Sequence, residues 1–353
     1  MNWSKFKTKN FCVVGFIVLV AVLFLVLLLP LALYVYNPLE KITKPIFEIL
    51  PYPVAVIDGN QIITTKTLIA DAESVRHFYE SQDFSSAGLR IDFSTEEGKM
   101  RLKIKEKEVL DKLIENAVIE KIANEREIVV SEKDIKNEIA GLTDKNGSLE
   151  ILEGNLKKLY GWDLEQFREK VIIPQIYLKK TIEYYIKKEE NKGDEWNRMQ
   201  EAKKKITENG SNFCEIAGSY SDGETAGSCG EIGWFQRQSL EPEIASVAFG
   251  MKVGEVSNVI KSSLGYHIIL LDETKQSEKE GSKISEVKLK QIFINNGGFV
   301  KWIREEKKKH KIWVPMKDYR WNQESASIKF QNNQLETKEQ QLRIKSEGDP
   351  IFY

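Results

Sequence analysis

A long apolar segment near the start of the chain sets the first constraint on its fold. Residues 11–36 carry no charged side chain, and Val, Leu and Ile dominate the segment. A helix rises about 1.5 Å per residue, so a helix of this length crosses the hydrocarbon core of a bilayer. We therefore predict a transmembrane helix at residues 11–36.

The residues that flank this segment predict its orientation. Lys5, Lys7 and Lys9 precede it, and the positive-inside tendency places residues 1–10 in the cytoplasm. A cleaved signal peptide is the alternative, but its apolar region is shorter and ends in a small-x-small site, which the sequence around Ala32 does not offer. We expect a single-pass protein of the cell membrane with extracytoplasmic C-terminal domains.

Charge and composition exclude other classes of function. The 353 residues include 52 Lys and Arg against 53 Asp and Glu, for a net charge of -1. The length favours more than one domain, and the balanced charge gives no reason to propose nucleic acid as a partner. The three histidines show no clustered Cys/His spacing, so we expect neither a metal nor a cofactor.

Two cysteines lie on the side of the membrane where a disulfide persists. Cys214 and Cys229 belong to separate local elements, and their Cα separation cannot be read from the sequence. The alternative to a bridge is a buried thiol in a helix at Cys214 and a loop thiol at Cys229. Both readings stay open.

The region after the apolar segment predicts a stalk and then a helical domain. Four prolines at 37–53 favour a semi-rigid stalk. Asp58 and Gly59 between two apolar runs indicate a β-hairpin. In the window 101–126 apolar residues recur at three- and four-residue spacing, which predicts a core helix. Two capping-box patterns predict further helix starts, and a later proline predicts a kink; these residues are Ser131 with Asp134, Asp163 with Gln166, and Pro174.

Composition also predicts where domains end. The charged run 187–196 contains Gly193 and indicates a boundary. We therefore expect a helical domain at 54–192, a second domain at 193–297, and a mobile polar tail at 317–353, where Gln, Asn, Glu and Lys dominate. The expected class is α+β.

The segment from Gly230 to His267 contains GEIGWF, PEIASVAFG and GYH in a fixed order. This order resembles the signature of the parvulin family of peptidyl-prolyl isomerases, in which a glycine-rich loop, a short helix and a terminal strand build one proline pocket. The resemblance implies an antiparallel sheet with flanking helices at 193–297. It also implies cis-trans isomerisation of X-Pro bonds.

The resemblance implies roles for individual residues. His267 takes the place of a histidine from a hydrogen-bonded pair that shapes the pocket floor, and Ser262 falls near the family's small-hydroxyl position. The residues expected to bind substrate are Leu240, Ile244, Phe249, Trp234 and Phe235. Taken one by one, the apolar residues are more readily explained as core, and His267 as a satisfied core histidine. Ser262 is equally explained as a turn serine.

The sequence departs from the family pattern at two places. Gly223 stands where the family commonly has Cys or Asp, with Asp222 beside it as a candidate substitute. The strand with the first histidine is missing before Trp196, but residues 285–295 resemble it, with Gln291 at the histidine position. We hypothesise a circularly permuted sheet with a His267–Gln291 pair.

The helical domain resembles a chaperone domain. The runs VAVIDGNQI and LIENAVIEKIANEREIVVS look like the N-terminal domain of SurA and trigger-factor-like foldases, with residues 298–316 as a segment that returns to complete it. The resemblance implies a cradle for unfolded chain, and an ordinary helical spacer is the alternative.

Together these patterns predict a membrane-anchored extracytoplasmic foldase that isomerises X-Pro bonds in unfolded, proline-containing exported polypeptides. The alternative is a parvulin-fold chaperone with weak or no catalysis, which the departures at Gly223 and Gln291 favour. A purely structural scaffold at the membrane is the third interpretation.

Overall fold

The computed structural model describes residues 16–22, 24, 28, 44–82, 92–188, 191–208, 212–276 and 284–346. The chain forms two compact units of helices and antiparallel strands. The first, here called the discontinuous unit, comprises residues 1–178 and 307–353. The second, the central unit, comprises residues 179–306. The α+β class is confirmed.

The boundary between the units differs from the one predicted at residue 193. Helix α8 (Ile173–Lys188) continues past residue 178, and its Tyr185 packs against Phe299 and Trp302 within the central unit. The charged run only marks the break before the next helix. Periodicity shows that a helix has an apolar face, but it does not show which partner covers that face.

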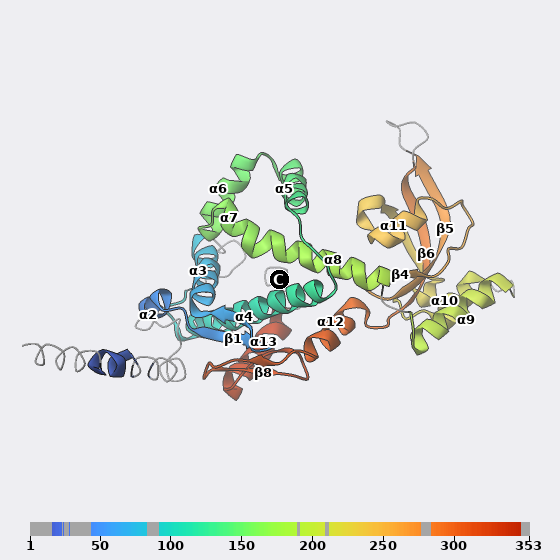
Figure 1. Ribbon diagram of the computed structural model, residues 1–353. Helices are drawn as coiled ribbons and strands as arrows, with labels where there is room; N and C mark the ends of the chain where they lie inside the picture. Colours follow the sequence, from blue (N-terminus) through green and yellow to red (C-terminus); the bar gives the residue numbers. More distant parts are fainter. Residues whose placement is uncertain are drawn as a thin grey trace, which may run out of the picture. The chain divides into compact units, whose positions relative to one another are not determined.

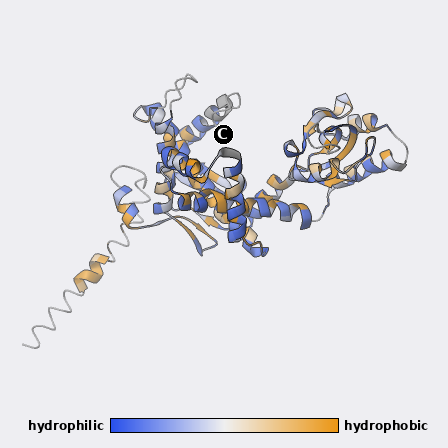
Figure 2. Ribbon diagram, turned by 90° about the horizontal axis from the view of Figure 1, so that it is seen from above, coloured by the Kyte–Doolittle hydropathy of each residue, from blue (hydrophilic) through white to orange (hydrophobic). Residues whose placement is uncertain are grey.

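Only part of the predicted transmembrane helix is described. Residues 16–22 are helical and apolar (Figure 2), and Phe16 is 66% exposed. Apart from residues 24 and 28, the rest of the span 11–36 and residues 1–10 lie outside the described residues. Among the residues that are described, no helix is both long and apolar enough to cross a membrane.

The discontinuous unit begins with a short helix and the predicted hairpin. α2 (Lys44–Ile49) precedes β1 (Pro53–Ile57) and β2 (Gln61–Thr64), which pair antiparallel. Asp58 and Gly59 adopt positive φ values of 49° and 76°, as a tight hairpin turn requires. The hairpin is therefore confirmed.

The proline-rich stalk is wrong from residue 44 onward. Pro45 stands in the first turn of α2, where its missing N–H has no partner to lose, and Phe47 of this helix is buried. Residues 37–43 of the predicted stalk lie outside the described residues. Phe47, a hydrogen bond from the Thr65 hydroxyl to its carbonyl oxygen and the Lys44–Glu73 ion pair together hold this short segment against α3.

The helices of the discontinuous unit follow the predicted pattern. α4 buries the apolar face read from its spacing, and both capping boxes are present. A π-helical turn immediately precedes α8, where Pro174 removes a backbone donor. The elements are α3 (Thr65–Ser81), α4 (Glu96–Glu125), α5 (Glu132–Asn146), α6 (Leu149–Tyr160), α7 (Leu164–Phe167) and η2 (Arg168–Ile172).

The C-terminal region folds back onto this unit, so the prediction of a mobile tail is wrong for residues 317–346, and residues 347–353 lie outside the described residues. β7 (Ile312–Trp313) pairs with β1, which gives a sheet of order β2-β1-β7. β8 (Tyr319–Asn322) and β9 (Ser327–Phe330) form a hairpin, and α13 (Asn333–Ser346) follows.

A few buried side chains hold the C-terminal region in place. Ile328 and Phe330 are almost completely buried. Lys107 of α4 forms an ion pair of 2.8 Å with Glu339 of α13, and their side chains are only 4% and 6% exposed. The sequence of this region did not predict these contacts, because only a few buried residues make them and the surrounding residues are polar.

The central unit has one sheet with helices on both faces (Figure 1). Its strand order is β3-β6-β5-β4, so the last strand in the sequence lies inside the sheet. All its strand pairs are antiparallel. The elements are α9 (Asp194–Glu208), α10 (Phe213–Tyr220), η3 (Ala226–Ser228), β3 (Glu231–Gln236), η4 (Arg237–Ser239), α11 (Pro242–Ala248), β4 (Ile260–Lys261), β5 (Tyr266–Gln276), β6 (Ile284–Ile294) and α12 (Gly298–Lys308).

Alternation along the strands separates two apolar layers. Tyr266 and Ile268 of β5 face α9 and α10, whereas Ile269 and Leu271 face α11. Since successive side chains of a strand point to opposite faces, His267 shares the α11 face. This face of the sheet positions the candidate site.

Candidate functional site

The site is built around the strand pair β5–β6. His267 stands opposite Phe293 in the register, and their rings stack with centroids 4.9 Å apart. Two glycines let the chain pass close to β6: a Cβ on Gly230 would lie 2.3 Å from the Gln291 carbonyl oxygen, and one on Gly265 2.4 Å from that of Ile294. Both contacts are far too short for any other residue.

His267 is held at both ring nitrogens. Its Nε2 lies 2.7 Å from the Ser262 hydroxyl, and its Nδ1 forms a hydrogen bond with the Gln291 side-chain amide. His267 is 2% exposed and Ser262 is fully buried. Burial lowers the pKa of His267 from 6.5 to about 4, so the imidazole is neutral near pH 7.

Ser262 has both of the roles weighed from the sequence. Its hydroxyl accepts a hydrogen bond of 3.0 Å from the backbone N–H of Leu264, which closes the turn between β4 and β5. The same hydroxyl contacts His267. The turn that ends β4 therefore also fixes the orientation of the imidazole.

An apolar cluster of side chains, here called the slot, lies on the same face of the sheet. Ile244 of α11 is buried, and Leu240, Phe249 and Phe235 are partly buried against the same cluster. The cluster includes Ile269 and Leu271 of β5 and Val287 and Leu289 of β6. These four predicted substrate-binding residues are brought together.

The structure adds one residue to the slot and separates another from it. Ile232 packs on the same cluster as Phe235. Strict alternation would put these two side chains on opposite faces, but the register shifts between Glu231 and Gly233, and such a bulge changes the facing of side chains. Trp234 is 36% exposed, is not among the side chains of this cluster, and its ring lies 4.0 Å from Lys275 Nζ.

Asp222 is engaged in the structure of its loop. One carboxylate oxygen accepts from Arg198 at 2.8 Å, and the other accepts from the backbone N–H of Asn295 at 2.9 Å. The neighbouring Ser221 hydroxyl accepts from the backbone N–H of Phe293 at 3.1 Å. These contacts fasten the loop to the end of β6, and Asp222 makes no hydrogen bond with His267.

The same loop carries the disulfide that the sequence left open. Cys214 of α10 is bonded to Cys229, which is separated from β3 by Gly230. The bridge closes the segment that contains Gly223. At this glycine a Cβ would meet Ser221 Oγ at 3.4 Å and Phe293 Cβ at 3.8 Å, so the position has room for a side chain.

Charged groups border the slot. The Arg237 guanidinium lies 4.7 Å from the ring centroid of Phe249. Glu241 follows Leu240 directly; one of its carboxylate oxygens contacts Ser263 Oγ at 3.4 Å, and the other is buried without a hydrogen-bond partner. Burial, and then the carboxylates of Glu241 and Glu183, raise the pKa of Glu243.

The described residues contain no group of three or more His, Cys, Asp or Glu side chains arranged to hold a metal ion. The polar groups of the site are the neutral imidazole, a hydroxyl and an amide.

Residues 177–273 match the family model of the PPIC-type PPIase domain, also called rotamase. The slot, His267 and Ser262 lie within the matched residues, whereas β6 with Gln291 lies beyond them. The central unit is therefore a parvulin-type (PPIC-type) peptidyl-prolyl isomerase domain.

The particular proteins that this chain resembles are the PrsA and SurA chaperones. It is 26% identical to the foldase protein PrsA of Oceanobacillus iheyensis over 177 residues, which cover 45% of this chain and 58% of the relative. It is 33% identical to the foldase protein PrsA of Bacillus subtilis over 122 residues, which cover 34% of this chain and 41% of the relative. It is 34% identical to the chaperone SurA of Chromohalobacter salexigens over 88 residues, which cover 25% of this chain and 20% of the relative.

Each of these matches spans less than two thirds of the relative. A crystal structure of PrsA from Bacillus subtilis matches 49% of this chain and 71% of its own at 24% identity, with a TM-score of 0.23. A structure of PrsA from Bacillus anthracis matches 48% of this chain and 80% of its own at 25% identity, with a TM-score of 0.23. The similarity of this chain to foldases therefore rests on the sequence matches.

Proposed function

We propose that the central unit isomerises X-Pro bonds in unfolded exported polypeptides and that the discontinuous unit holds these polypeptides as a chaperone. The observation that carries the proposal is the arrangement of Leu240 and Ile244 on the same face of the sheet as the buried, neutral pair of His267 and Gln291. An apolar slot beside an uncharged polar floor fits a proline ring and its preceding amide.

The chemistry needs no bond to break. Rotation about an X-Pro bond has a barrier of about 18–20 kcal/mol, and amide resonance is lost at its top. The catalyst must grip the proline ring, exclude water and favour the twisted amide. The slot supplies the first two requirements. The neutral His267 supports them, because a charged imidazole in this position would draw in water.

Glu241 adds an acceptor at the edge of the slot. Its buried, unpartnered carboxylate oxygen is unfavourable in the free protein, since a desolvated acceptor without a donor costs about 1–3 kcal/mol. A backbone N–H of a bound polypeptide satisfies this oxygen. Binding energy gained beside the proline then helps to hold the substrate in register with the slot.

Binding without catalysis is the second candidate. Gly223 and Gln291 favour it, because neither supplies the titrating or nucleophilic group that the family commonly has there. Under this alternative the slot and Glu241 still bind proline-containing chains, but the rate of isomerisation stays at the uncatalysed value.

Isomerisation of X-Pro peptides separates the two candidates. Exchange NMR on the full-length protein should show catalysis that Leu240→Ala reduces about tenfold or more, since truncation of an apolar anchor removes about 2 kcal/mol of substrate contact. The matched control is Leu264→Ala, because Leu264 is 54% exposed in the same unit. Exchange at the buffer rate with the unmutated protein contradicts the enzyme and leaves the binding function.

Anchoring and chaperone activity need their own measurements. We propose that residues 11–36 span the membrane and leave both units outside the cytoplasm. Deletion of residues 1–36 should release the protein from membranes, and release of the full-length protein by high salt alone contradicts the anchor.

The full-length protein with Leu240→Ala should still suppress aggregation of an unfolded client if the discontinuous unit holds clients.

A further inference from the structure

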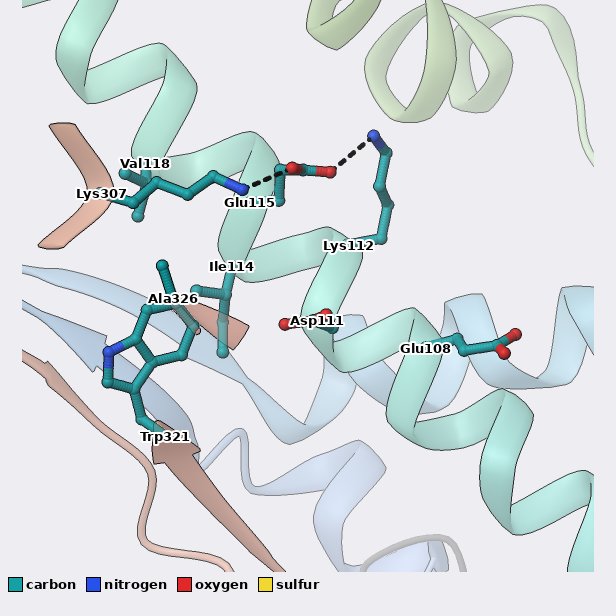
Figure 3. Close-up of a pocket in the computed structure, with 9 residues that line it drawn as sticks. All are labelled: Glu108, Asp111, Lys112, Ile114, Glu115, Val118, Lys307, Trp321 and Ala326. Carbon is teal, nitrogen blue, oxygen red and sulfur yellow. Dashed lines mark hydrogen bonds and ion pairs between the residues drawn. The ribbon is translucent and has the colours of Figure 1, made fainter. Parts of the chain in front are cut away.

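The discontinuous unit contains a pocket that the isomerase function does not use. It lies beside α4 and β8, and its floor is apolar, with Ile114 and Val118 fully buried. Trp321 of β8 forms one wall (Figure 3). The pocket is lined by Glu108, Asp111, Lys112, Ile114, Glu115, Val118, Lys307, Trp321 and Ala326.

The size of the pocket suits one side chain. Its cavity volume is about 140 Å³. A cavity of roughly 150 Å³ accommodates a molecule of the size of benzene. The pocket therefore fits a side chain that ends in a planar group and has a flexible aliphatic part. The main chain of such a ligand would stay outside the pocket.

Asp111 is the carboxylate of the pocket without a cation of its own. It accepts a hydrogen bond of 2.8 Å from the backbone N–H of Ile328, and it forms no ion pair with any residue that the structure describes. Burial raises the pKa of this carboxyl group. A desolvated carboxylate of this kind gains more from a cation than an exposed one does.

The other charges around the pocket already have partners. Lys307 and Lys112 both contact Glu115, at 2.5 Å and 3.1 Å. Glu108 is paired with Lys105 at 2.8 Å. Lys307 and Lys107 attract Asp111 only from beyond ion-pair distance, so among the described residues this carboxylate has no cation in direct contact.

We infer that this pocket binds a single arginine side chain of a client polypeptide. The guanidinium is planar and always charged, so it stacks on the Trp321 ring and pairs with Asp111 at the same time. Figure 3 shows the Asp111 carboxylate and the indole ring directed toward the same space beside α4. That the arginine belongs to a client rests on the proposed chaperone function, whereas the site itself does not.

Fluorine NMR tests the site directly. The full-length protein carries 5-fluorotryptophan at its seven tryptophans, and Trp321→Phe assigns the resonance of Trp321. It is titrated with N-acetyl-arginine N-methylamide and with the citrulline analogue, which has nearly the same shape and no charge. We expect a saturable shift of the Trp321 resonance with arginine and affinity for citrulline lower by about tenfold or more.

Variants locate the charge that is responsible. Asp111→Asn keeps an acceptor for the Ile328 N–H and should abolish the preference for arginine over citrulline. Glu96→Gln removes an exposed, paired carboxylate of α4 that does not line the pocket, and it should leave the affinity within about twofold. The comparison of the two ligands on the unmutated protein remains decisive if a variant fails to fold.

Several results would overturn the inference. Equal shifts with citrulline make the pocket apolar rather than cation-selective. A shift with N-acetyl-glutamate N-methylamide instead of arginine assigns the pocket to anions at Lys112 and Lys307. An unchanged Trp321 resonance excludes a side-chain site altogether. None of these readouts depends on isomerase activity, so failure of the site and failure of the proposed function are distinguishable.

Discussion

The Ser262 hydroxyl lies 2.7 Å from Nε2 of His267, and the Gln291 amide occupies the other ring nitrogen. Neither partner carries a charge, so nothing in this pair compensates an imidazolium. The pair keeps the imidazole neutral and fixed in orientation. The stability of the central unit should therefore depend on pH.

Acid should destabilise the central unit through His267. The pKa of His267 is about 4 when folded, against 6.5 for the free side chain. Between these values the unfolded chain binds more protons, so this stability is complete above pH 6.5 and is lost as the pH falls toward 4. The unfolding free energy should drop by about 3 kcal/mol over this window. Urea titrations from pH 7.5 to 4 check this, with His267→Asn as the variant that should show a smaller slope.

A side chain at position 223 should raise isomerase activity. Gly223 has room for a Cβ, and an aspartate there restores a residue type that the family uses beside the floor of the slot. We expect Gly223→Asp to raise kcat/KM about tenfold, the scale of one added hydrogen bond. Gly223→Ala is the control for the backbone change, and an increase of the same size with alanine would assign the effect to rigidity.

Asp58 should stabilise the discontinuous unit at neutral pH. Burial alone would raise the pKa of Asp58, but hydrogen bonds from His310, the Lys311 N–H and Lys121 lower it to about 2. This contribution is present above the ordinary pKa near 3.8 and is lost as the pH falls to about 2. Asp58→Asn keeps a residue that tolerates the turn and should cost about 1 kcal/mol or less at pH 7, because water screens this exposed carboxylate. Denaturation at pH 7 and at pH 2 measures it, and the difference between the two proteins should vanish in acid.

The buried pair of Lys107 and Glu339 should behave as a unit. Removing only Glu339 leaves a buried ammonium without its partner, which costs about 3–5 kcal/mol. We therefore expect Glu339→Gln to loosen α13, measured as faster amide exchange in residues 333–341. The double variant Lys107→Met with Glu339→Leu should recover most of the loss, and equal destabilisation by both would show that packing rather than charge matters.

Local sequence patterns account for much of the structure. Turn residues, capping boxes and apolar spacing identify the hairpin at Asp58, both capped helices and the core face of α4. The alternation of residues 285–295 led to the hypothesis that this strand lies beside β5, and the structure has that strand pair. These features depend on neighbours in sequence.

The features that the sequence hid depend on distant partners. The C-terminal tail looked mobile because Ile328 and Phe330 are only two apolar residues in a polar region. Both lie against α4, more than 200 residues earlier in the chain: the Ile328 N–H donates to Asp111, and the Lys107 ammonium lies over the Phe330 ring. Asp222 resembled a catalytic substitute, but Arg198 and Asn295 hold its carboxylate. Side-chain periodicity contains no information about such contacts.

The position of β6 has a consequence for how this protein is made. During synthesis from the N-terminus, β3, β4 and β5 are made before β6, which separates β3 from β5 in the finished sheet. In the same way, the discontinuous unit is complete only after β7 and α13 have been made. The central unit therefore cannot reach its final topology before β6 has been made, and the discontinuous unit cannot do so before α13 has been made, so both units complete their folding late in synthesis.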